Sequence, residues 1–399
     1  MKKILYLFVA AISLFTSCDN EQDPIFDDSP ETRINNVLTK YKTALTKDDG
    51  YWIAYYSGSA ILMKFNEDNT VEFESTYSDG SEDRTISYRV SITQVPELVF
   101  ESHSVFQAIY EDNLATGEYE FLFDKVTDDR IDFISKTDKG ANKTKLTFFK
   151  GVPEDIATVK KIISKMEKSF FKHVSVEGSN YKAMLVTNGG NAIWRTISKD
   201  GKIENKEYEF SMTKDGLVFS PAVEIEGVEV TLFDNQVGKD LFSANVEGKT
   251  INIEIGNAPL TEESGVYEEF MATNFKVING YSQALSSIVP SLKEDIKQFN
   301  AFQIYVEWGY LLGYAPGHEG GNWAGFSKFA FTKAAEDITV VTWGYGAYGA
   351  WWSEIYGNDG GKLLLEFLTD PSGLYIVKAG NDTYYLVSKA DPSKYILVG

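Results

Sequence analysis

Cys18 is the only cysteine of the 399-residue chain, and its neighbours indicate what its thiol does. It follows a basic start, an apolar run over residues 4–15 and the small residues Thr16 and Ser17. These are the three regions of a secretory signal peptide, and the apolar run is shorter than the roughly 20 residues that span a bilayer. A lone cysteine cannot form an internal disulfide, and a free thiol is a liability on an exported protein. The sequence therefore predicts that residues 1–17 are removed and that the Cys18 thiol is acylated.

The segments on either side of Cys18 predict where the protein goes. The stretch before it resembles a bacterial lipobox, with Phe15 at a position where leucine is commoner. An ordinary signal peptide with an incidental cysteine is the alternative. Residues 18–30 are acidic and predict a solvated tether. An acidic stretch after a lipidated cysteine resembles the signal that sends Bacteroidota lipoproteins to the outer face of the outer membrane, where several acyl chains would anchor the protein.

The residues that usually carry out catalysis do not form a recognisable motif. The three histidines, His103, His173 and His318, lie in separate segments without His-x-x-x-His or His-Glu-x-x-His spacing, and no Gly-x-Ser-x-Gly elbow is present. We therefore expect no metal, no cofactor and no enzymatic activity. Aspartate and glutamate are plentiful, so a glycosidase-type carboxylate pair remains open.

Aromatic residues are unevenly distributed, with five of the seven tryptophans in the last third of the chain among tyrosines and glycines. Flat aromatic rings stack on the apolar faces of sugars, and they are also favoured at protein interfaces. The alternative is a β core with every second ring facing inward, although adjacent rings on a strand point to opposite faces. The predicted ligand-binding residues are Trp308, Trp323, Trp343, Tyr345, Tyr348, Trp351 and Trp352.

Composition limits the class of protein. The formal net charge is −20 and becomes more negative when Lys2 and Lys3 leave with the signal peptide, which argues against binding nucleic acid or an anionic membrane through bulk charge. A hydrophobic content of 43% and an aromatic content of 14% indicate a folded globular chain. The length suggests two or three domains.

The elements that would position these residues follow a repeated order, in which a helix precedes a set of short strands. Helical periodicity begins near residues 31, 153 and 281, and the last stretch extends to about residue 300 across Pro290. Alternating patterns and frequent turn signals follow each helix. We predict three helix-led β modules, at 31–151, 152–258 and 265–399.

The fold class predicted is mainly β, α+β overall, with antiparallel meander or lipocalin-like barrel modules. Gly50-Tyr51-Trp52 is similar to the Gly-x-Trp start of lipocalin-type barrels, and it also fits a glycine helix stop before a core tryptophan. The segment 88–100 echoes 208–219, and 365–376 does so more weakly, which indicates an internal repeat.

These pieces together resemble a family of Bacteroidota surface lipoproteins known as domain of unknown function 4302. The resemblance rests on Gly50-Tyr51-Trp52, on the hairpin at 65–71 and on the segments 87–90, 117–121, 373–377 and 385–388. At 95–100 the chain departs from the family pattern, which puts that turn in doubt. The resemblance implies a setting beside starch-utilisation-type uptake systems, which pair a TonB-dependent transporter with surface lipoproteins. It implies no catalytic residues.

The sequence thus leads to an ordered set of functional hypotheses. The first is a non-catalytic outer-membrane surface lipoprotein that faces the cell exterior and binds a nutrient, a glycan or a peptide, for a neighbouring TonB-dependent transporter. The second is a structural accessory subunit whose aromatic surface binds the transporter or a partner lipoprotein. The third is a carboxylate-based hydrolase.

Overall fold

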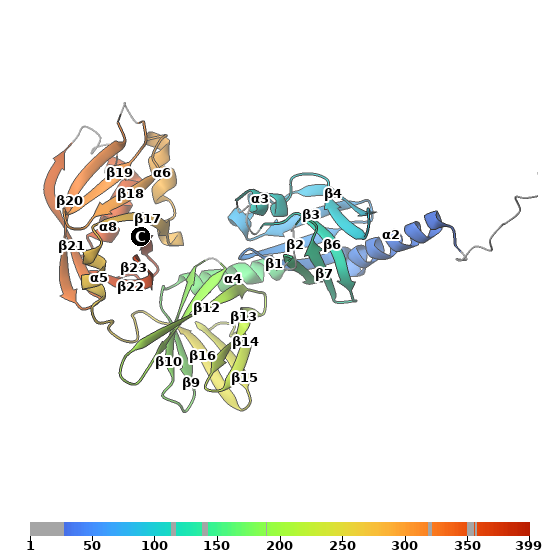
Figure 1. Cartoon of the computed structure of the whole chain (residues 1–399), viewed down its shortest axis with the longest axis horizontal. Helices are drawn as coiled ribbons and strands as arrows, with labels where there is room; N and C mark the ends of the chain where they lie inside the picture. The colour runs from blue at the N-terminus through green and yellow to red at the C-terminus, as the bar shows by residue number, and fades with distance from the viewer. Residues whose placement is uncertain are drawn as a thin grey trace, which may run out of the picture. The chain divides into compact units, whose positions relative to one another are not determined.

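Three closed β-barrels make up most of the computed structural model, which describes residues 28–112, 117–137, 143–188, 190–317, 321–348, 355 and 357–399 (Figure 1). Each barrel contains eight strands, and in the second barrel β9 closes the sheet between β10 and β16. A closed barrel pairs both edges of its sheet, so each module satisfies its own backbone hydrogen bonds. The predicted mainly β fold of antiparallel barrel modules with helices is confirmed.

Two compact units divide the chain. One unit holds most of the first barrel, and the other holds the second and third barrels together with residues 53–62 and 74–82. Among the helices in the described ranges, none combines the length and the apolar character that crossing a lipid bilayer requires.

The first barrel follows a long helix that begins at a proline. Ser29 caps this helix, because its hydroxyl group accepts a hydrogen bond of 3.1 Å from the Thr32 N–H, and Pro30 occupies the first turn, where no N–H is needed. The elements are α2 (Pro30–Thr46), η1 (Asp48–Gly50), β1 (Tyr51–Tyr56), β2 (Ser59–Phe65), β3 (Thr70–Ser75), η2 (Tyr77–Gly80), β4 (Thr85–Ile92), β5 (Pro96–Phe100), α3 (Val105–Asp112), β6 (Glu120–Val126), β7 (Arg130–Ser135) and β8 (Lys145–Lys150).

Gly50 and Trp52 fix the passage from helix to barrel. Gly50 has a φ of 72°, and a Cβ atom there would lie 2.2 Å from the Phe65 carbonyl oxygen, so only glycine fits. Trp52 is buried, and its indole N–H donates a hydrogen bond of 2.8 Å to the Leu45 carbonyl at the end of α2. The Lys150 ammonium group lies 4.2 Å from the centre of the Trp52 ring. Trp52 therefore contacts the end of α2 and links β1, the first strand of the barrel, with β8, the last.

Aromatic side chains fill the interior of the first barrel. Helix α3 supplies Phe106, which is fully buried. Its ring centre lies 5.4 Å from that of Phe100, 5.2 Å from that of Phe121 and 6.4 Å from that of Phe148. An eight-stranded barrel can be filled by side chains or can hold one small ligand. The contacts of Phe106 show that side chains fill this one.

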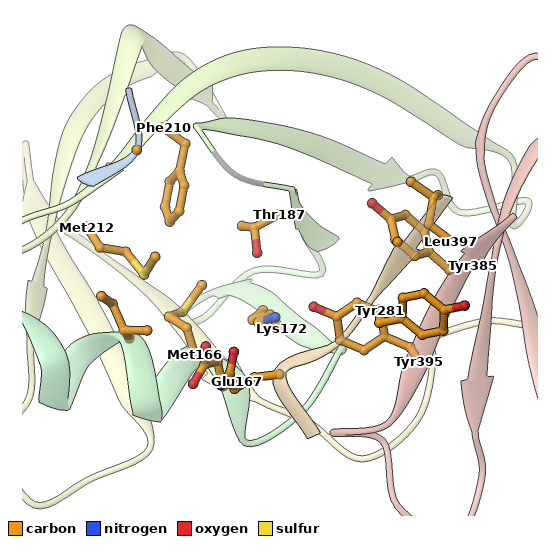
Figure 2. A pocket seen from close by; sticks show the side chains of 14 residues that line it. Met166, Glu167, Lys172, Thr187, Phe210, Met212, Tyr281, Tyr385, Tyr395 and Leu397 are labelled. Atoms are coloured by element: carbon orange, nitrogen blue, oxygen red, sulfur yellow. The ribbon is translucent and has the colours of Figure 1, made fainter. Parts of the chain in front are cut away.

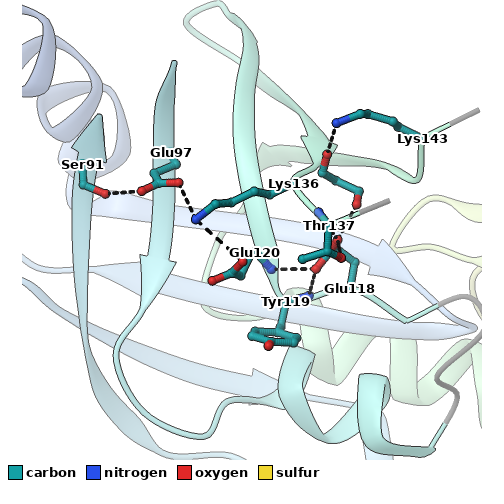
Figure 3. Close-up of polar contacts among 9 residues, drawn as sticks. Ser91, Glu97, Glu118, Tyr119, Glu120, Lys136, Thr137 and Lys143 are labelled. Carbon is teal, nitrogen blue, oxygen red and sulfur yellow. Dashed lines mark hydrogen bonds and ion pairs between the residues drawn. The ribbon is translucent and has the colours of Figure 1, made fainter. Parts of the chain in front are cut away.

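A buried carboxylate, Glu118, fastens the start of β6 to the end of β7 (Figure 3). One oxygen accepts hydrogen bonds from the backbone N–H groups of Tyr119 and Glu120, at 2.8 and 3.0 Å. The other accepts from the hydroxyl groups of Ser135 and Thr137, the latter at 2.6 Å, and from the Thr137 N–H at 3.3 Å. Burial alone would raise the pKa of Glu118, but these hydrogen bonds lower it below its usual value.

The second barrel begins after helix α4 and has its own core. Buried rings of Trp194, Phe219 and Phe233 meet inside it, and the Trp194 N–H donates to the Tyr181 hydroxyl at 2.8 Å. The elements are α4 (Asp155–Glu167), β9 (Lys172–Val176), β10 (Lys182–Asn188), β11 (Asn191–Ile197), β12 (Ile203–Met212), β13 (Gly216–Ile225), β14 (Val228–Asn235), β15 (Leu241–Val246) and β16 (Lys249–Ile255).

The third barrel corrects one expectation. The helix predicted from about residue 281 to 300 is wrong in extent, because β17 runs to Tyr281 and only residues 288–295 form an α-helix. Pro290 is the third residue of that helix, so it lies in the first turn, where its missing N–H breaks no helical hydrogen bond. The elements are α5 (Val266–Ala272), β17 (Phe275–Tyr281), η3 (Gln283–Leu285), α6 (Ile288–Asp295), β18 (Ala301–Tyr305), β19 (Tyr310–Tyr314), β20 (Trp323–Ala335), β21 (Ile338–Tyr348), α8 (Asp359–Leu368), β22 (Leu374–Gly380), β23 (Thr383–Ser388) and β24 (Tyr395–Val398).

An apolar cluster joins the second and third barrels within their unit. Phe170 lies 4.9 Å from the Tyr385 ring, and its N–H donates to the Pro392 carbonyl at 2.7 Å. Arg195, almost fully buried on β11, forms an ion pair of 2.6 Å with Glu263 in the segment between the barrels. The cluster consists of Phe170, Phe171, Met184, Val186, Val377, Tyr385 and Val387.

The hydrogen bonds of Glu118 predict a pH-dependent contribution to stability. Glu118→Gln should lower the free energy of unfolding at neutral pH by about 1–3 kcal/mol, because buried donors lose their acceptor. The folded-state pKa is depressed, so the stabilisation is present above the unfolded pKa of about 4.3 and is lost as pH falls through the folded value. The difference between variant and wild type should therefore shrink in acid. Urea unfolding at several pH values measures it, with Asp124→Asn on the exposed side of β6 as the control. A pH-independent difference would contradict this account.

Candidate functional site

The structure describes some of the predicted aromatic residues fully and others only in part. Trp308 lies in the turn between β18 and β19 and is 61% exposed, and Trp343 lies in β21 and is 41% exposed. The backbones of Trp323, Tyr345 and Tyr348 belong to β20 and β21, and their side chains are not described. Trp351 and Trp352 lie outside the described residues.

Three aromatic rings form a continuous row on the outer face of the third barrel. Phe275 on β17 and Tyr305 on β18 are direct cross-strand partners, and their ring centres lie 5.1 Å apart. The Tyr305 ring stacks on Trp308 at 5.2 Å with only 4° between the ring planes. Phe275 is 43% exposed. We call Phe275, Tyr305 and Trp308 the aromatic row.

Alternation along the strands explains why the row faces outward. On β18, Phe302 and Ile304 belong to the core of the third barrel, so Tyr305 must point to the opposite face. On β17, Lys276 is fully buried, which leaves its neighbour Phe275 outside. Tyr310, the partner of Tyr305 on β19, continues the same face.

Backbone hydrogen bonds fix the turn that carries Trp308. The N–H groups of Val306 and Glu307 donate to the backbone carbonyl and the side-chain oxygen of Asn274, at 2.7 and 2.9 Å. Gly309 has a φ of 64°, and a Cβ atom there would lie 2.4 Å from the Phe329 carbonyl oxygen. The Phe329 N–H in turn donates to the Gly309 carbonyl at 2.7 Å. Trp308 is therefore exposed on a turn that is held at both ends.

Trp343 does not join the aromatic row. It is paired with Phe329, which belongs to the core of the third barrel, and paired residues share one face of a sheet. Its indole N–H donates a hydrogen bond of 2.5 Å to the Ser327 hydroxyl group, which is buried. Trp343 thus belongs to the inner face of the sheet although it keeps 41% of its surface exposed. The predicted aromatic segment is divided between two faces.

The aromatic row can bind a ligand by stacking. An exposed Trp–Tyr stack flanked by Phe275 presents contiguous flat apolar surface, while scattered single hydrophobic residues are ordinary on a protein surface. Aromatic rings of this kind suit the apolar faces of sugar rings or another aromatic group. The row contains no general acid, base or nucleophile aligned for a reaction.

The described histidines do not form a catalytic or metal site. His103 approaches Glu111 at 3.3 Å in the first barrel, and the His173 Nε2 atom lies 2.7 Å from the Ala258 carbonyl oxygen in the second. His318 lies outside the described residues. In the part of the chain that the structure describes, no group of three histidine, cysteine, aspartate or glutamate residues is placed to hold a metal ion.

A second candidate site was missed from the sequence. It is a pocket of about 320 Å³ in the unit that holds the second and third barrels, and its lining includes Lys172, Thr187 and Tyr281 (Figure 2). The signal in the sequence was a lysine at an inward position of an alternating strand, Lys172 before Val174 and Val176. The other side of the pocket comes from β17, β23 and β24, which no local pattern could reveal.

The described residues thus form three helix-associated β-barrels, the third of which carries an exposed aromatic row. Residues 22–236 match the family described as Domain of unknown function (DUF4302), which is more than half of the chain. The chain belongs to this family. No curated protein matches its sequence.

Solved structures give weak matches to this chain. The DNA polymerase III β sliding clamp of Bartonella birtlesii LL-WM9 is 9% identical, over 90% of this chain and 96% of the clamp, with a TM-score of 0.19. The β subunit from Thermotoga maritima is 11% identical, over 92% and 96%, and the Helicobacter pylori β clamp with diflunisal is 10% identical, also over 92% and 96%. Both have a TM-score of 0.19, so these matches carry no argument about fold or function.

The difference in exposure between Trp308 and Trp52 predicts a small and a large loss of stability when each is replaced by alanine. Trp308→Ala should lower the free energy of unfolding by no more than about 1.5 kcal/mol, because the ring lies mostly in solvent and its contact is the stack on Tyr305. Trp52→Ala should cost about 3–5 kcal/mol, because it leaves a cavity and an unpaired carbonyl at the helix end. Denaturant unfolding of the two variants measures the difference. Equal losses would show that Trp308 is a core residue.

Proposed function

We propose that this chain is a non-catalytic lipoprotein of the outer membrane, anchored through Cys18 and facing the cell exterior, which captures a nutrient glycan for a TonB-dependent uptake system. The observation that carries the proposal is the exposed Tyr305–Trp308 stack beside Phe275. An exposed, ordered aromatic surface loses little conformational entropy when it binds a ligand, because its rings are already in place. The signal segment before Cys18 and the acidic tether after it support the location.

The chemistry of the row favours a sugar over a charged ligand. Its rings offer apolar faces and one phenol hydroxyl group, and none of its three residues is charged. Sugar rings present C–H faces that stack on aromatic planes and hydroxyl groups that bind polar tips. Peptides with aromatic side chains could use the same surface, and they are the second class of probe.

Calorimetric titration of the mature chain without Cys18 tests the capture. Amylopectin, pullulan, xylan and an aromatic-rich peptide mixture serve as probes, and at least one polysaccharide should give saturable binding. Trp308→Ala should weaken that binding by about tenfold or more, since a central aromatic contact is often worth over 1.4 kcal/mol. Calorimetry is preferable to tryptophan fluorescence here, because Trp308 would itself be the reporter.

Matched variants make this test specific. Phe149→Ala removes another exposed aromatic ring, from β8 of the first barrel, and should leave the affinity unchanged. Trp343→Ala removes an exposed ring from the inner face and should also have little effect. A flat response to every polysaccharide, or equal loss in all three variants, would overturn the proposal.

The second candidate function is a structural accessory subunit that binds a transporter or a partner lipoprotein. The same exposed row favours it, because aromatic residues are enriched at the centres of protein interfaces. Co-purification with a transporter that is lost in Trp308→Ala, without any polysaccharide binding, would support this function instead.

Lipid attachment predicts the behaviour of a Cys18 variant. In a bacterial host that processes lipoproteins, the full chain should incorporate an alkyne-labelled fatty acid and sediment with membranes, while Cys18→Ser should do neither. Gel fluorescence and fractionation measure both effects. Protease added to intact cells should degrade the anchored protein. Labelling that persists in Cys18→Ser would contradict attachment at this residue.

A further inference from the structure

The pocket of about 320 Å³ lies at one end of the second barrel and is completed by the third. Lys172, Val174 and Val176 alternate with less buried residues on β9, and both valines belong to the barrel core, so Lys172 faces inward. Thr187 extends the inward face of Ala183 and Leu185 on β10. Figure 2 shows Tyr281, Tyr385, Tyr395 and Leu397 of the third barrel on the opposite side of the pocket.

Lys172 is a buried basic residue that lines the pocket. Its side chain is 4% exposed, and burial is the main influence on its amino group. The charged neighbour that acts on it is Glu167, which ends α4 and also lines the pocket. Burial of an unpaired charge costs several kcal/mol, so a partner is expected.

A second polar group in the pocket is unsatisfied. The Tyr281 hydroxyl oxygen is buried and has no hydrogen-bond partner among the described residues. Burial raises the pKa of Tyr281, so the phenol remains neutral and can donate a hydrogen bond. In Figure 2, Lys172 lies in the middle of the pocket, between Thr187, Glu167 and Tyr281. Two hydrogen-bond donors thus line the pocket, and the Glu167 carboxylate is the acidic group beside them.

The remaining walls of the pocket combine polar residues, among them Thr187 and Gln283, with apolar side chains. Met166 and Phe210 belong to the core of the second barrel, and Met212 packs against it. Ile163 and Leu397 add aliphatic surface. A pocket of this volume and lining suits a small molecule with an apolar body, and methionine adapts to different shapes.

We propose that this pocket binds a small carboxylic acid with an apolar body, whose carboxylate lies between the Lys172 ammonium and Tyr281 hydroxyl groups. The carboxylate accepts a charge-assisted hydrogen bond from Lys172 and a hydrogen bond from the Tyr281 hydroxyl. The apolar body lies against Met166, Phe210 and Met212. The site is separate from the aromatic row, because none of the pocket's lining residues belongs to the row.

Binding of the carboxylic acid should weaken as pH rises. Burial lowers the pKa of Lys172 to about 8, while Glu167 opposes the shift. A carboxylate ligand favours the ammonium form, so binding is present below pH 8 and is lost as pH rises above it. Two acidic groups lie around Lys172: Glu167 on α4, and Asp79 on η2, which acts on Glu167. The phenol groups around it are those of Tyr281 on β17, Tyr385 on β23 and Tyr395 on β24. Burial raises the pKa of each tyrosine, so all three stay neutral in this pH range.

Calorimetry of the mature chain with a series of straight-chain acids, from butanoate to decanoate, tests the proposal. At neutral pH at least one acid should bind saturably, and its primary amide should bind about tenfold more weakly or not at all. Lys172→Met should lower the affinity for the acid by about tenfold or more and leave the affinity for the amide unchanged. Glu167→Gln should raise the affinity for the acid roughly two- to fivefold, because a competing carboxylate is removed.

The controls separate a binding role from a structural one. Lys161→Met makes the same chemical change on the exposed side of α4 and should not alter binding. The midpoint of thermal unfolding of Lys172→Met should be equal to or higher than that of wild type, since a buried charge is removed. The wild-type acid–amide comparison and the surface variant Glu167→Gln remain decisive if Lys172→Met unfolds. Absence of binding across the series, equal affinity for acid and amide, or unchanged affinity in Lys172→Met would overturn the proposal.

Discussion

Aromatic side chains packed inside eight-stranded barrels are the interaction on which the rest of the structure depends. Phe106 on α3 and the rings around it close the first barrel, and Trp194 with its neighbours closes the second. Two of the places that remain for a ligand are the outer face of the third barrel and the pocket at the end of the second barrel.

Two buried charges illustrate how stability and binding can be told apart. Glu118 receives hydrogen bonds from Ser135, Thr137 and two further backbone N–H groups, so its charge is satisfied by the fold itself. Lys172 is also buried, but it lines a pocket, and burial lowers its pKa while Glu167 opposes that shift. The fold satisfies Glu118, whereas the unsatisfied Tyr281 hydroxyl group beside Lys172 supports the ligand site that we propose.

Local patterns in the sequence predicted the fold class, because strand alternation and helix caps are local properties. Ser29, Gly50 and Trp52 have physical roles that their neighbours in the chain already suggest. The prediction of a helix over 281–300 was wrong in extent, because Tyr281 ends a strand that pairs with the distant β24. Nothing within that segment indicates the pairing.

The candidate sites were less predictable for the same reason. Trp308 could be identified from the density of aromatic residues, but Phe275 joins it only through the pairing of β17 with β18. Trp343 belongs to the same segment and faces inward, because its register with Phe329 decides its side. Lys172 needed the third barrel to complete its pocket. Strand register and contacts between barrels depend on residues that are far apart in the sequence, so no short segment predicts them.

Oxidative footprinting of individual tryptophans tests most directly whether the outer face of the third barrel captures a glycan. Hydroxyl radicals and mass spectrometry would give the oxidation rate of each tryptophan, first in the free chain and then with each polysaccharide. The account predicts fast oxidation of Trp308, slow oxidation of Trp52 and Trp194, and selective slowing at Trp308 when a polysaccharide binds. An unchanged Trp308 rate with every polysaccharide would contradict it.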